Sequence, residues 1–434
     1  MTSIDTKQTH KTLFKNASIY VVLQVVNKGI PFLLLPILTR YFSTQEYGII
    51  ASYNLFLGFI TILIAINLHG AANVNYFHLK KDEFRNYVGN LFNILLFSTL
   101  IVLIIVFLFS NLITGKLNIS SLWLYVAICA ALMQTLTIIN LTLWMAEQKP
   151  KPYAIYEISQ TLVNIGLSLL LVIVYHFNWQ GRIIGTSIAS IIFGLISMYI
   201  LFKRGFARFN YYWPHIKDAL KFGIPLIPHQ FALWMRSGID IVLITSIVGL
   251  SATGVYSVGL QLGAIIGIIA HAFNNAYSPY LYKKLKNITN RDKLSVVIFT
   301  YLYFISILLI ALCFSAIFII ALPLLVGKDF QEASRLILLI SLAYAFNGMY
   351  LMVVNYIYYV KKTHLLSMAT IATSILHVLL SYLLLKEFGI IGVAYASLIS
   401  FFISFVIVWR ISAKVYTMPW NLKLSESNQS ERDA

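Results

Sequence analysis

Charged residues are scarce in this chain. Of its 434 residues, 11% are Asp, Glu, Lys or Arg, and only 15 are acidic. A soluble domain of ordinary composition carries about a quarter charged residues. Hydrophobic residues instead reach 59%. The composition therefore excludes an ordinary soluble protein and indicates that lipid surrounds most of the chain.

Cysteine and recognisable catalytic motifs are also nearly absent. The two cysteines, Cys129 and Cys313, each lie inside an apolar stretch and offer neither a disulfide framework nor metal-ligand spacing. The sequence has no phosphate-binding loop of the ATPase type, no GxSxG and no HExxH. We therefore expect no enzymatic activity, no metal and no cofactor. Any transport would draw on an ion gradient, the substrate gradient or later consumption of the product.

Long apolar stretches dominate what remains. A helix needs about 20 apolar residues to cross a hydrocarbon core of about 30 Å. The segments between such stretches are too short to form a separate soluble domain. The sequence predicts an all-α integral membrane protein whose twelve transmembrane helices span 15–38, 48–69, 88–113, 121–145, 154–175, 181–202, 220–247, 253–278, 295–326, 335–359, 365–385 and 389–411.

The net charge of +17 is distributed between loops rather than gathered on one face. Of the 32 Lys and Arg residues, 24 lie in the amino-terminal segment, the even-numbered loops and the tail, and six lie in the odd-numbered loops. The other two, Lys28 and Arg236, lie inside spans. This alternation follows the positive-inside rule and predicts that both termini are cytoplasmic. It argues against nucleic acid as a partner.

Short patterns recur at a shift of about 206 residues. Gly48 opens the second span and Gly254 the eighth, and the segments 185–190 and 392–397 lie early in the sixth and twelfth. Six spans per repeat give both halves the same orientation, which is one of the standard constructions of transporters. We expect two parallel six-helix bundles, with the chain divided into a cytoplasmic amino terminus (1–14), a first bundle (15–210), a second bundle (211–414) and a cytoplasmic tail (415–434).

Ionisable residues inside spans are costly and mark functional candidates. Lys28 continues a polar stripe with Gln24 and Asn27, and either lines a cavity or reaches towards the membrane surface. Arg236 and Asp240 are four residues apart on one helix face and could neutralise each other. Asp240 and Glu157 are the two candidates for coupling to an ion.

Neutral polar residues, prolines and a glycine run add further candidates. Asn164, His229 and Asn274 belong to a larger set of intramembrane polar groups that suggests a hydrated interior. Prolines interrupt corresponding spans of the two halves, as at many transport sites. They are Pro31 and Pro36 in span one, and Pro225 and Pro228 in span seven. The tandem GxxxG run Gly259, Gly263 and Gly267 predicts close helix packing.

Two stretches, one through span one and one beginning in span seven, resemble a known family. The residues concerned are Tyr20, Gln24, Asn27, Pro31, Pro36, Arg40, Tyr47 and Gly48, then Lys221, Pro225, Pro228, His229, Asp240, Gly249, Gly254, Tyr256, Ser278, Pro279, Tyr280 and Tyr282. With them the chain resembles, over residues 13–414, the polysaccharide biosynthesis transporters. These are the Wzx-like O-antigen flippases of the multidrug/oligosaccharidyl-lipid/polysaccharide exporter superfamily.

The resemblance implies a function and a site. Such proteins move undecaprenyl-pyrophosphate-linked oligosaccharides, O-antigen or capsule repeat units, from the cytoplasmic to the periplasmic leaflet of the bacterial inner membrane. The implied fold is MATE-like, with a V-shaped cavity between the bundles. Its cationic residues would be Lys28 and Arg236, with Arg40 at the periplasmic mouth, and cations suit a pyrophosphate. Membrane lipid, a polysaccharide polymerase and a chain-length regulator are the further partners expected.

Two alternatives stay open. An ion-coupled multidrug exporter of the same superfamily would favour cationic substrates and acidic cavity residues, and Asp240 is the clear midspan acid. A polysaccharide polymerase is also polytopic, but it should carry a large periplasmic loop. No odd-numbered loop here exceeds about 15 residues.

Overall fold

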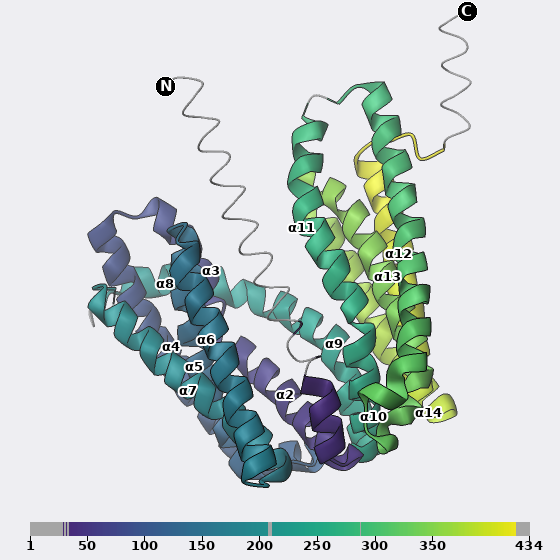
Figure 1. Ribbon diagram of the computed structural model, residues 1–434. Helices are drawn as coiled ribbons and strands as arrows, with labels where there is room; N and C mark the ends of the chain where they lie inside the picture. The colour runs from purple at the N-terminus through teal and green to yellow at the C-terminus, as the bar shows by residue number, and fades with distance from the viewer. Residues whose placement is uncertain (1–28, 30–31, 33, 207–210, 287, 422–434) are drawn as a thin grey trace, which may run out of the picture. The chain divides into compact units, whose positions relative to one another are not determined.

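The computed structural model of the protein describes residues 29, 32, 34–206, 211–286 and 288–421. Helices make up nearly all of this part of the chain, and it contains no β-strand. Two compact units divide the molecule between Gly254 and Val255. Figure 1 labels the helices and colours them by their position along the chain.

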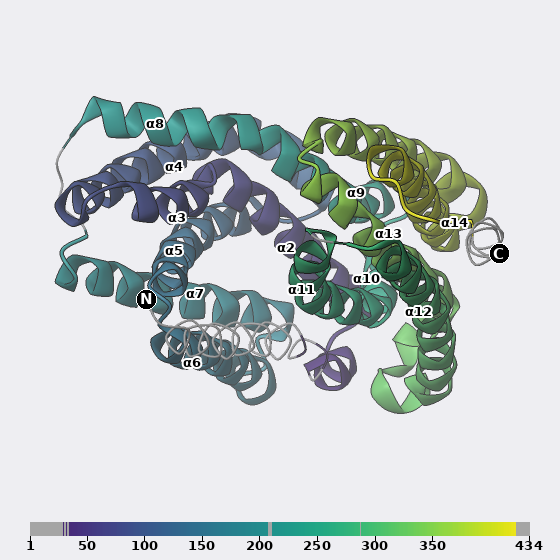
Figure 2. The ribbon, with the colours of Figure 1, turned by 90° about the horizontal axis from the view of Figure 1, so that it is seen from above.

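Helix α5 is the centre of the first unit. It packs against α2, α3, α4, α6 and α7, and Figure 2 shows it between α3 and α7. Buried alanines of α5, among them Ala127 and Ala131, let the neighbouring helices approach closely. The elements of this unit are α2 (Thr44–Ala65), α3 (Leu68–His78), α4 (Lys81–Leu117), α5 (Ser121–Ala146), α6 (Pro150–Leu169), the π-helix η1 (Leu170–Val174), α7 (Asn178–Lys203), α8 (Trp213–Gly223), the 3-10 helix η2 (Ile224–Leu226) and α9 (Ile227–Ile247).

The second unit gathers its helices around α13, which packs against α11, α12 and α14. Its aromatic core includes Phe304, Phe405 and Trp409, whose rings contact one another. The elements are α10 (Leu250–Gly263), which begins at the end of the first unit, α11 (Ile265–Leu285), α12 (Asn290–Leu325), the 3-10 helix η3 (Lys328–Ala333), α13 (Ser334–Tyr359) and α14 (Thr363–Val415).

Local sequence signals place several helix ends. Ser43 caps α2, because its hydroxyl accepts from the backbone of Glu46 while the Glu46 carboxylate accepts from the backbone of Ser43. Thr289 and Asp292 form the same reciprocal capping box at the start of α12. Each box satisfies backbone N–H groups that a helix start leaves without partners.

The predicted close packing of the glycine run is confirmed. A Cβ atom on Gly259, Gly263 or Gly267 would approach side-chain atoms of α13 to within 2.5–2.8 Å. The α13 residues concerned, Leu336, Ile340 and Tyr344, are spaced by four and therefore share one helix face. The absence of side chains at these glycines is what allows the helices to meet.

Helix α14 is a hairpin of two helices. Its 53 residues are interrupted at Gly389, where φ is 60° and ψ is −147°. The imidazole Nδ1 of His377 lies 3.0 Å from the hydroxyl of Ser400. In a straight helix these residues would be about 35 Å apart. The chain therefore folds back at Gly389, as the two predicted spans 365–385 and 389–411 require.

Nine helices of the described residues have the length and composition to cross a membrane. They comprise α2 with α3, α4, α5, α6 with η1, α7, α10 with α11, α12, η3 with α13, and α14. Large apolar side chains lie exposed along α4 and α12, as expected of surfaces facing lipid. The chain is an all-helical, multi-pass membrane protein.

The predicted number of twelve spans is not confirmed by this count. Helix α9 occupies the predicted seventh span. Within it, only the segment Gly238–Ile247 is an apolar helix, and this segment is too short to cross a membrane. Most of the predicted first span, 15–38, lies outside the described residues.

Equivalent residues of the proposed repeats meet inside the first unit. A Cβ atom on Gly48 would lie 2.0 Å from the carbonyl oxygen of Leu250, and one on Gly254 would lie 1.9 Å from that of Thr44. Thr44 and Leu250, like Gly48 and Gly254, are 206 residues apart. Replacing each residue of one contact by its counterpart 206 positions away therefore gives the other contact. This is the same shift that relates the proposed repeats.

Candidate functional site

The structure describes only part of the predicted cavity. Gln24, Asn27, Lys28 and Pro31 lie outside the described residues. Pro36 is half-buried in the helical segment 34–41, and Arg40 near the end of this segment is exposed.

Helix α9 carries three of the predicted polar residues. A 3-10 turn with Pro225 at its centre precedes the helix, and Pro228 stands in its first turn. His229 is exposed, whereas Asp240 is buried with 4% of its surface accessible. Arg236 stands one turn before Asp240 on the same helix.

A polar cluster joins α6 and α7 inside the first unit. Nη1 of Arg182 donates hydrogen bonds to the amide oxygen of Asn164 at 2.9 Å and to the hydroxyl oxygen of Ser168 at 2.7 Å. The same amide oxygen accepts from the hydroxyls of Ser168 and Thr186, both at 3.3 Å. We call these four residues the Arg182 cluster.

A glycine makes the Arg182 cluster possible. A Cβ atom on Gly185 would lie 2.7 Å from the backbone nitrogen of Ser168, so only glycine allows α6 and α7 to approach this closely. The π-helix η1 follows two residues after Ser168. Such widened turns occur frequently at functional sites. The narrow helix crossing brings Asn164 and Ser168 within reach of a guanidinium on the neighbouring helix.

A row of hydroxyls continues from the cluster along α7. The Ser187 hydroxyl lies 3.0 Å from that of Tyr53, and Gln134 donates to Ser190 at 3.2 Å. Further along, Ser197 contacts both Asn140 and Tyr156. Together these contacts link α7 to α2, α5 and α6. The row therefore orders the bundle interior, and the cation lies at its start.

The other predicted residues stay apart from the cluster. Asn274 accepts a hydrogen bond from Asn355 at 2.8 Å inside the second unit, and Tyr282 donates to the Asn355 amide oxygen at 3.3 Å. Glu157 is half-buried on α6, almost two turns before Asn164. Of the predicted site residues described, only Asn164 belongs to the Arg182 cluster.

Arg182 itself is a candidate that the sequence analysis missed. Arg182 lies at the edge of the predicted span 181–202 and is one of the six basic residues assigned to the odd-numbered loops. In the structure it is a half-buried residue of α7. The spacing of four between Arg182, Thr186 and Ser190 was a usable signal, since such residues share one helix face. The contact with Asn164 depends on tertiary packing and had no signal of its own.

The matched family covers the whole Arg182 cluster. The sequence matches the family described as polysaccharide biosynthesis protein over residues 13–285, more than half of the chain. The chain belongs to this family. The expected relationship to polysaccharide biosynthesis transporters is thereby confirmed.

Two proteins of Haemophilus influenzae are similar to this family member along most of their length. One, named Lsg locus putative protein 1, is 27% identical over 374 residues, which cover 84% of this chain and 90% of the relative. The other, named as an uncharacterized membrane protein, is 24% identical over 426 residues, covering 93% and 98%.

Solved structures share the fold of this polysaccharide biosynthesis protein. The inward closed conformation of the lipid II flippase MurJ has a TM-score of 0.72 at 16% identity, covering 93% of this chain and 87% of that one. A multidrug resistance MATE family transporter has a TM-score of 0.60 at 12% identity, covering 89% and 97%. The expected MATE-like membrane fold is confirmed. Neither protein is named as an enzyme, which agrees with the expectation that this chain is not one.

Proposed function

We propose that this protein is a flippase for a lipid-linked oligosaccharide. Membership of the polysaccharide biosynthesis family supports a substrate that is a precursor of a sugar polymer. The fold shared with a flippase and a transporter supports movement of that substrate across a membrane. The observation that carries the proposal is the Arg182 cluster, a cation within the bundle held by neutral oxygens. Alternating access by the two repeats would move the substrate from the cytoplasmic to the periplasmic leaflet.

The chemistry of the Arg182 cluster suits an anionic headgroup. Both of its hydrogen bonds start from Nη1, so the Nη2 and Nε donors point to other directions of the guanidinium fork. A planar guanidinium pairs well with phosphate oxygens, often through two parallel bonds. Arg182 would therefore bind the pyrophosphate of the substrate while Asn164 and Ser168 hold its orientation.

The substrate would be an undecaprenyl-pyrophosphate-linked O-antigen or capsule repeat unit, and the membrane the bacterial inner membrane with both termini cytoplasmic. Lys28 and Arg236 would add cationic contacts, with Arg40 at the periplasmic mouth, and a polymerase and a chain-length regulator would act on the product. Asp240 and Glu157 remain the residues proposed for ion coupling.

Deletion of the gene tests this function directly. We expect the lipid-linked oligosaccharide to accumulate in the cytoplasmic leaflet, measured by its protection from a glycosidase added outside intact spheroplasts. Re-expression of the wild-type chain should restore access to the enzyme. Unchanged access in the deletion strain would contradict the proposal.

One observation favours a second function, the export of small molecules. The fold is shared with a multidrug resistance transporter, and Asp240 is an acidic residue buried on α9. An exporter would leave the lipid-linked oligosaccharide normal after deletion and would lower the minimum inhibitory concentration of cationic drugs. Measuring both in one deletion strain separates the two functions.

A further inference from the structure

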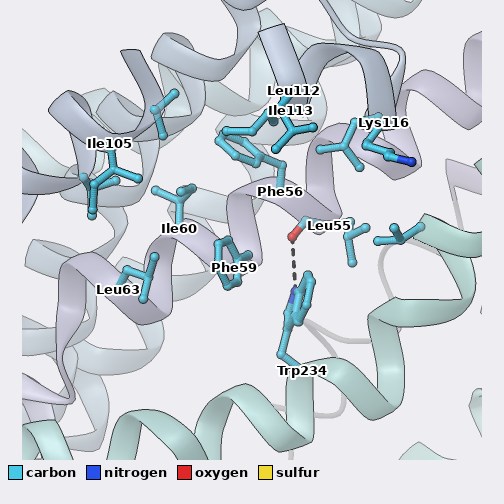
Figure 3. Close-up of a pocket in the computed structure, with 14 residues that line it drawn as sticks. Leu55, Phe56, Phe59, Ile60, Leu63, Ile105, Leu112, Ile113, Lys116 and Trp234 are labelled. Carbon is cyan, nitrogen blue, oxygen red and sulfur yellow. Dashed lines mark hydrogen bonds between the residues drawn. The ribbon is translucent and has the colours of Figure 1, made fainter. Parts of the chain in front are cut away.

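An apolar groove lies on the first unit between α2, α4 and α9. Its volume is about 290 Å³, and every residue that lines it except Lys116 is aliphatic or aromatic. Figure 3 shows Phe56, Phe59 and Ile60 of α2 facing it from one side, with Trp234 of α9 on another. The groove does not involve the Arg182 cluster.

Trp234 forms a rigid wall of this groove. Its indole Nε1 donates a hydrogen bond to the carbonyl oxygen of Leu55 at 3.2 Å. Its ring lies 5.0 Å from that of Phe59 and 5.6 Å from that of Phe231, measured between centroids. The ring is therefore held by contacts with both α2 and α9.

One cation stands at the end of the groove. Lys116, in the last turn of α4, is its single charged lining residue. Figure 3 shows its amine beyond the apolar residues, near Leu112 and Ile113 and away from Leu63 and Ile105. The side chain is exposed and forms no ion pair within the described part of the chain. The charge pattern of the loops assigns this end of α4 to the periplasmic side.

The volume of the groove fits one hydrocarbon chain rather than several. Along α4 the lining runs from Val102 to Leu117, a rise of about 22 Å. The groove volume equals that of about ten waters of roughly 30 Å³ each, and a methylene group is of similar size. A long polyprenyl tail would exceed this space several times.

We propose that the groove binds one acyl chain of an anionic phospholipid in the periplasmic leaflet. The chain would lie against Phe56, Phe59 and Trp234, and the phosphate would pair with the Lys116 amine. A cation at the end of an apolar groove complements an anion at the end of an apolar chain. The groove shares no residue with the Arg182 cluster, and its lipid would bind whether or not the proposed flippase function holds.

Native mass spectrometry of the full-length protein in detergent tests the proposal. The probes are phosphatidylglycerol and phosphatidylcholine with identical acyl chains. We expect tighter binding of phosphatidylglycerol, and an affinity about tenfold weaker in Lys116→Ala, as loss of one charge-assisted hydrogen bond predicts. Lys116→Arg should bind like the wild type. Lys386→Ala, which removes another exposed lysine, is the matched control.

A second pair of variants tests the apolar part. Ile105→Trp fills the groove and should weaken binding of both lipids, whereas Leu108→Trp adds the same bulk at an exposed α4 position outside the lining. Equal phosphatidylglycerol affinity in Lys116→Ala and Lys386→Ala would overturn the proposal. So would displacement of the phospholipid by an equimolar polyprenyl phosphate, which would make the groove a prenyl site.

Discussion

Arg182 and Arg204 differ in how the protein compensates their charge. Arg204 pairs with the carboxylate of Glu147, which also contacts Lys149, and its guanidinium lies over the ring of Phe206. Burial lowers the pKa of Arg204, and the Glu147 carboxylate opposes that shift. Arg182 instead bonds to an amide and a hydroxyl oxygen. Neutral acceptors orient a cation without cancelling it, so Arg182 keeps a net attraction for anions.

Substitutions of Arg182 separate the role of its charge from that of its hydrogen bonds. Arg182→Gln keeps a donor for Asn164 but removes the charge, whereas Arg182→Lys keeps the charge but loses the fork. We expect surface polysaccharide to fall about tenfold or more in Arg182→Gln and less in Arg182→Lys, since hydrogen bonds to charged groups contribute about 1.5–3 kcal/mol. Immunoblotting of cell-surface glycan measures both.

The control for these variants is Arg335→Ala, which removes an exposed arginine of the second unit. It should leave the glycan unchanged. If Arg182→Lys lost more activity than Arg182→Gln, the cluster would be acting through hydrogen bonding alone, and the pyrophosphate contact would be wrong.

At the scale of elements, the contact of α10 and α11 with α13 depends on missing side chains. A methyl group at Gly263 would lie 2.5 Å from Ile340, a β-branched side chain with little freedom to move. We expect Gly263→Ala to lower the free energy of unfolding by about 1–3 kcal/mol, the usual cost of overpacking. Thermal unfolding in detergent, followed by circular dichroism, measures it.

Gly166→Ala is the matched control for this substitution. A Cβ atom there meets nothing within 4 Å, and the residue lies inside α6. Alanine should stabilise that helix by up to about 1 kcal/mol. Equal melting temperatures for the two variants would show that α10 and α13 are free to separate.

The hairpin of α14 makes a second prediction at this scale. The φ and ψ angles of Gly389 lie in a region essentially restricted to glycine. Gly389→Ala should therefore destabilise the protein by about 1–3 kcal/mol, although its Cβ atom would meet no neighbour within 4 Å. A melting temperature equal to that of the wild type would mean that the turn accepts other backbone angles.

The sequence predicted elements better than contacts, for physical reasons. Hydropathy separated the two arms of α14 because Lys386 and Glu387 interrupt the apolar run near the turn. The glycine spacing also predicted tight packing, although not that α13 is the partner. Asn164 stood out because a polar residue inside an apolar helix is costly. Its bond with Arg182 depends on the approach at Gly185, which spacing along a chain does not encode.

For the whole molecule, the loop charges make a prediction about topology. With Cys129 and Cys313 replaced by alanine, single cysteines can report on each side of the membrane. A membrane-impermeant maleimide should label Asn118→Cys, between α4 and α5, in intact cells. It should label Gln148→Cys, between α5 and α6, only after permeabilisation. The reverse pattern would place both termini in the periplasm.

The paired contacts of Gly48 with Leu250 and of Gly254 with Thr44 bear on the origin of the chain. In a symmetric homodimer, a residue that touches a partner residue is touched in return by its own copy. The two contacts show the same reciprocal pattern, but both partners belong to one polypeptide. We infer that the ancestor was a six-helix protein that dimerised through the glycine now represented by Gly48 and Gly254. Gene duplication and fusion later joined its two copies.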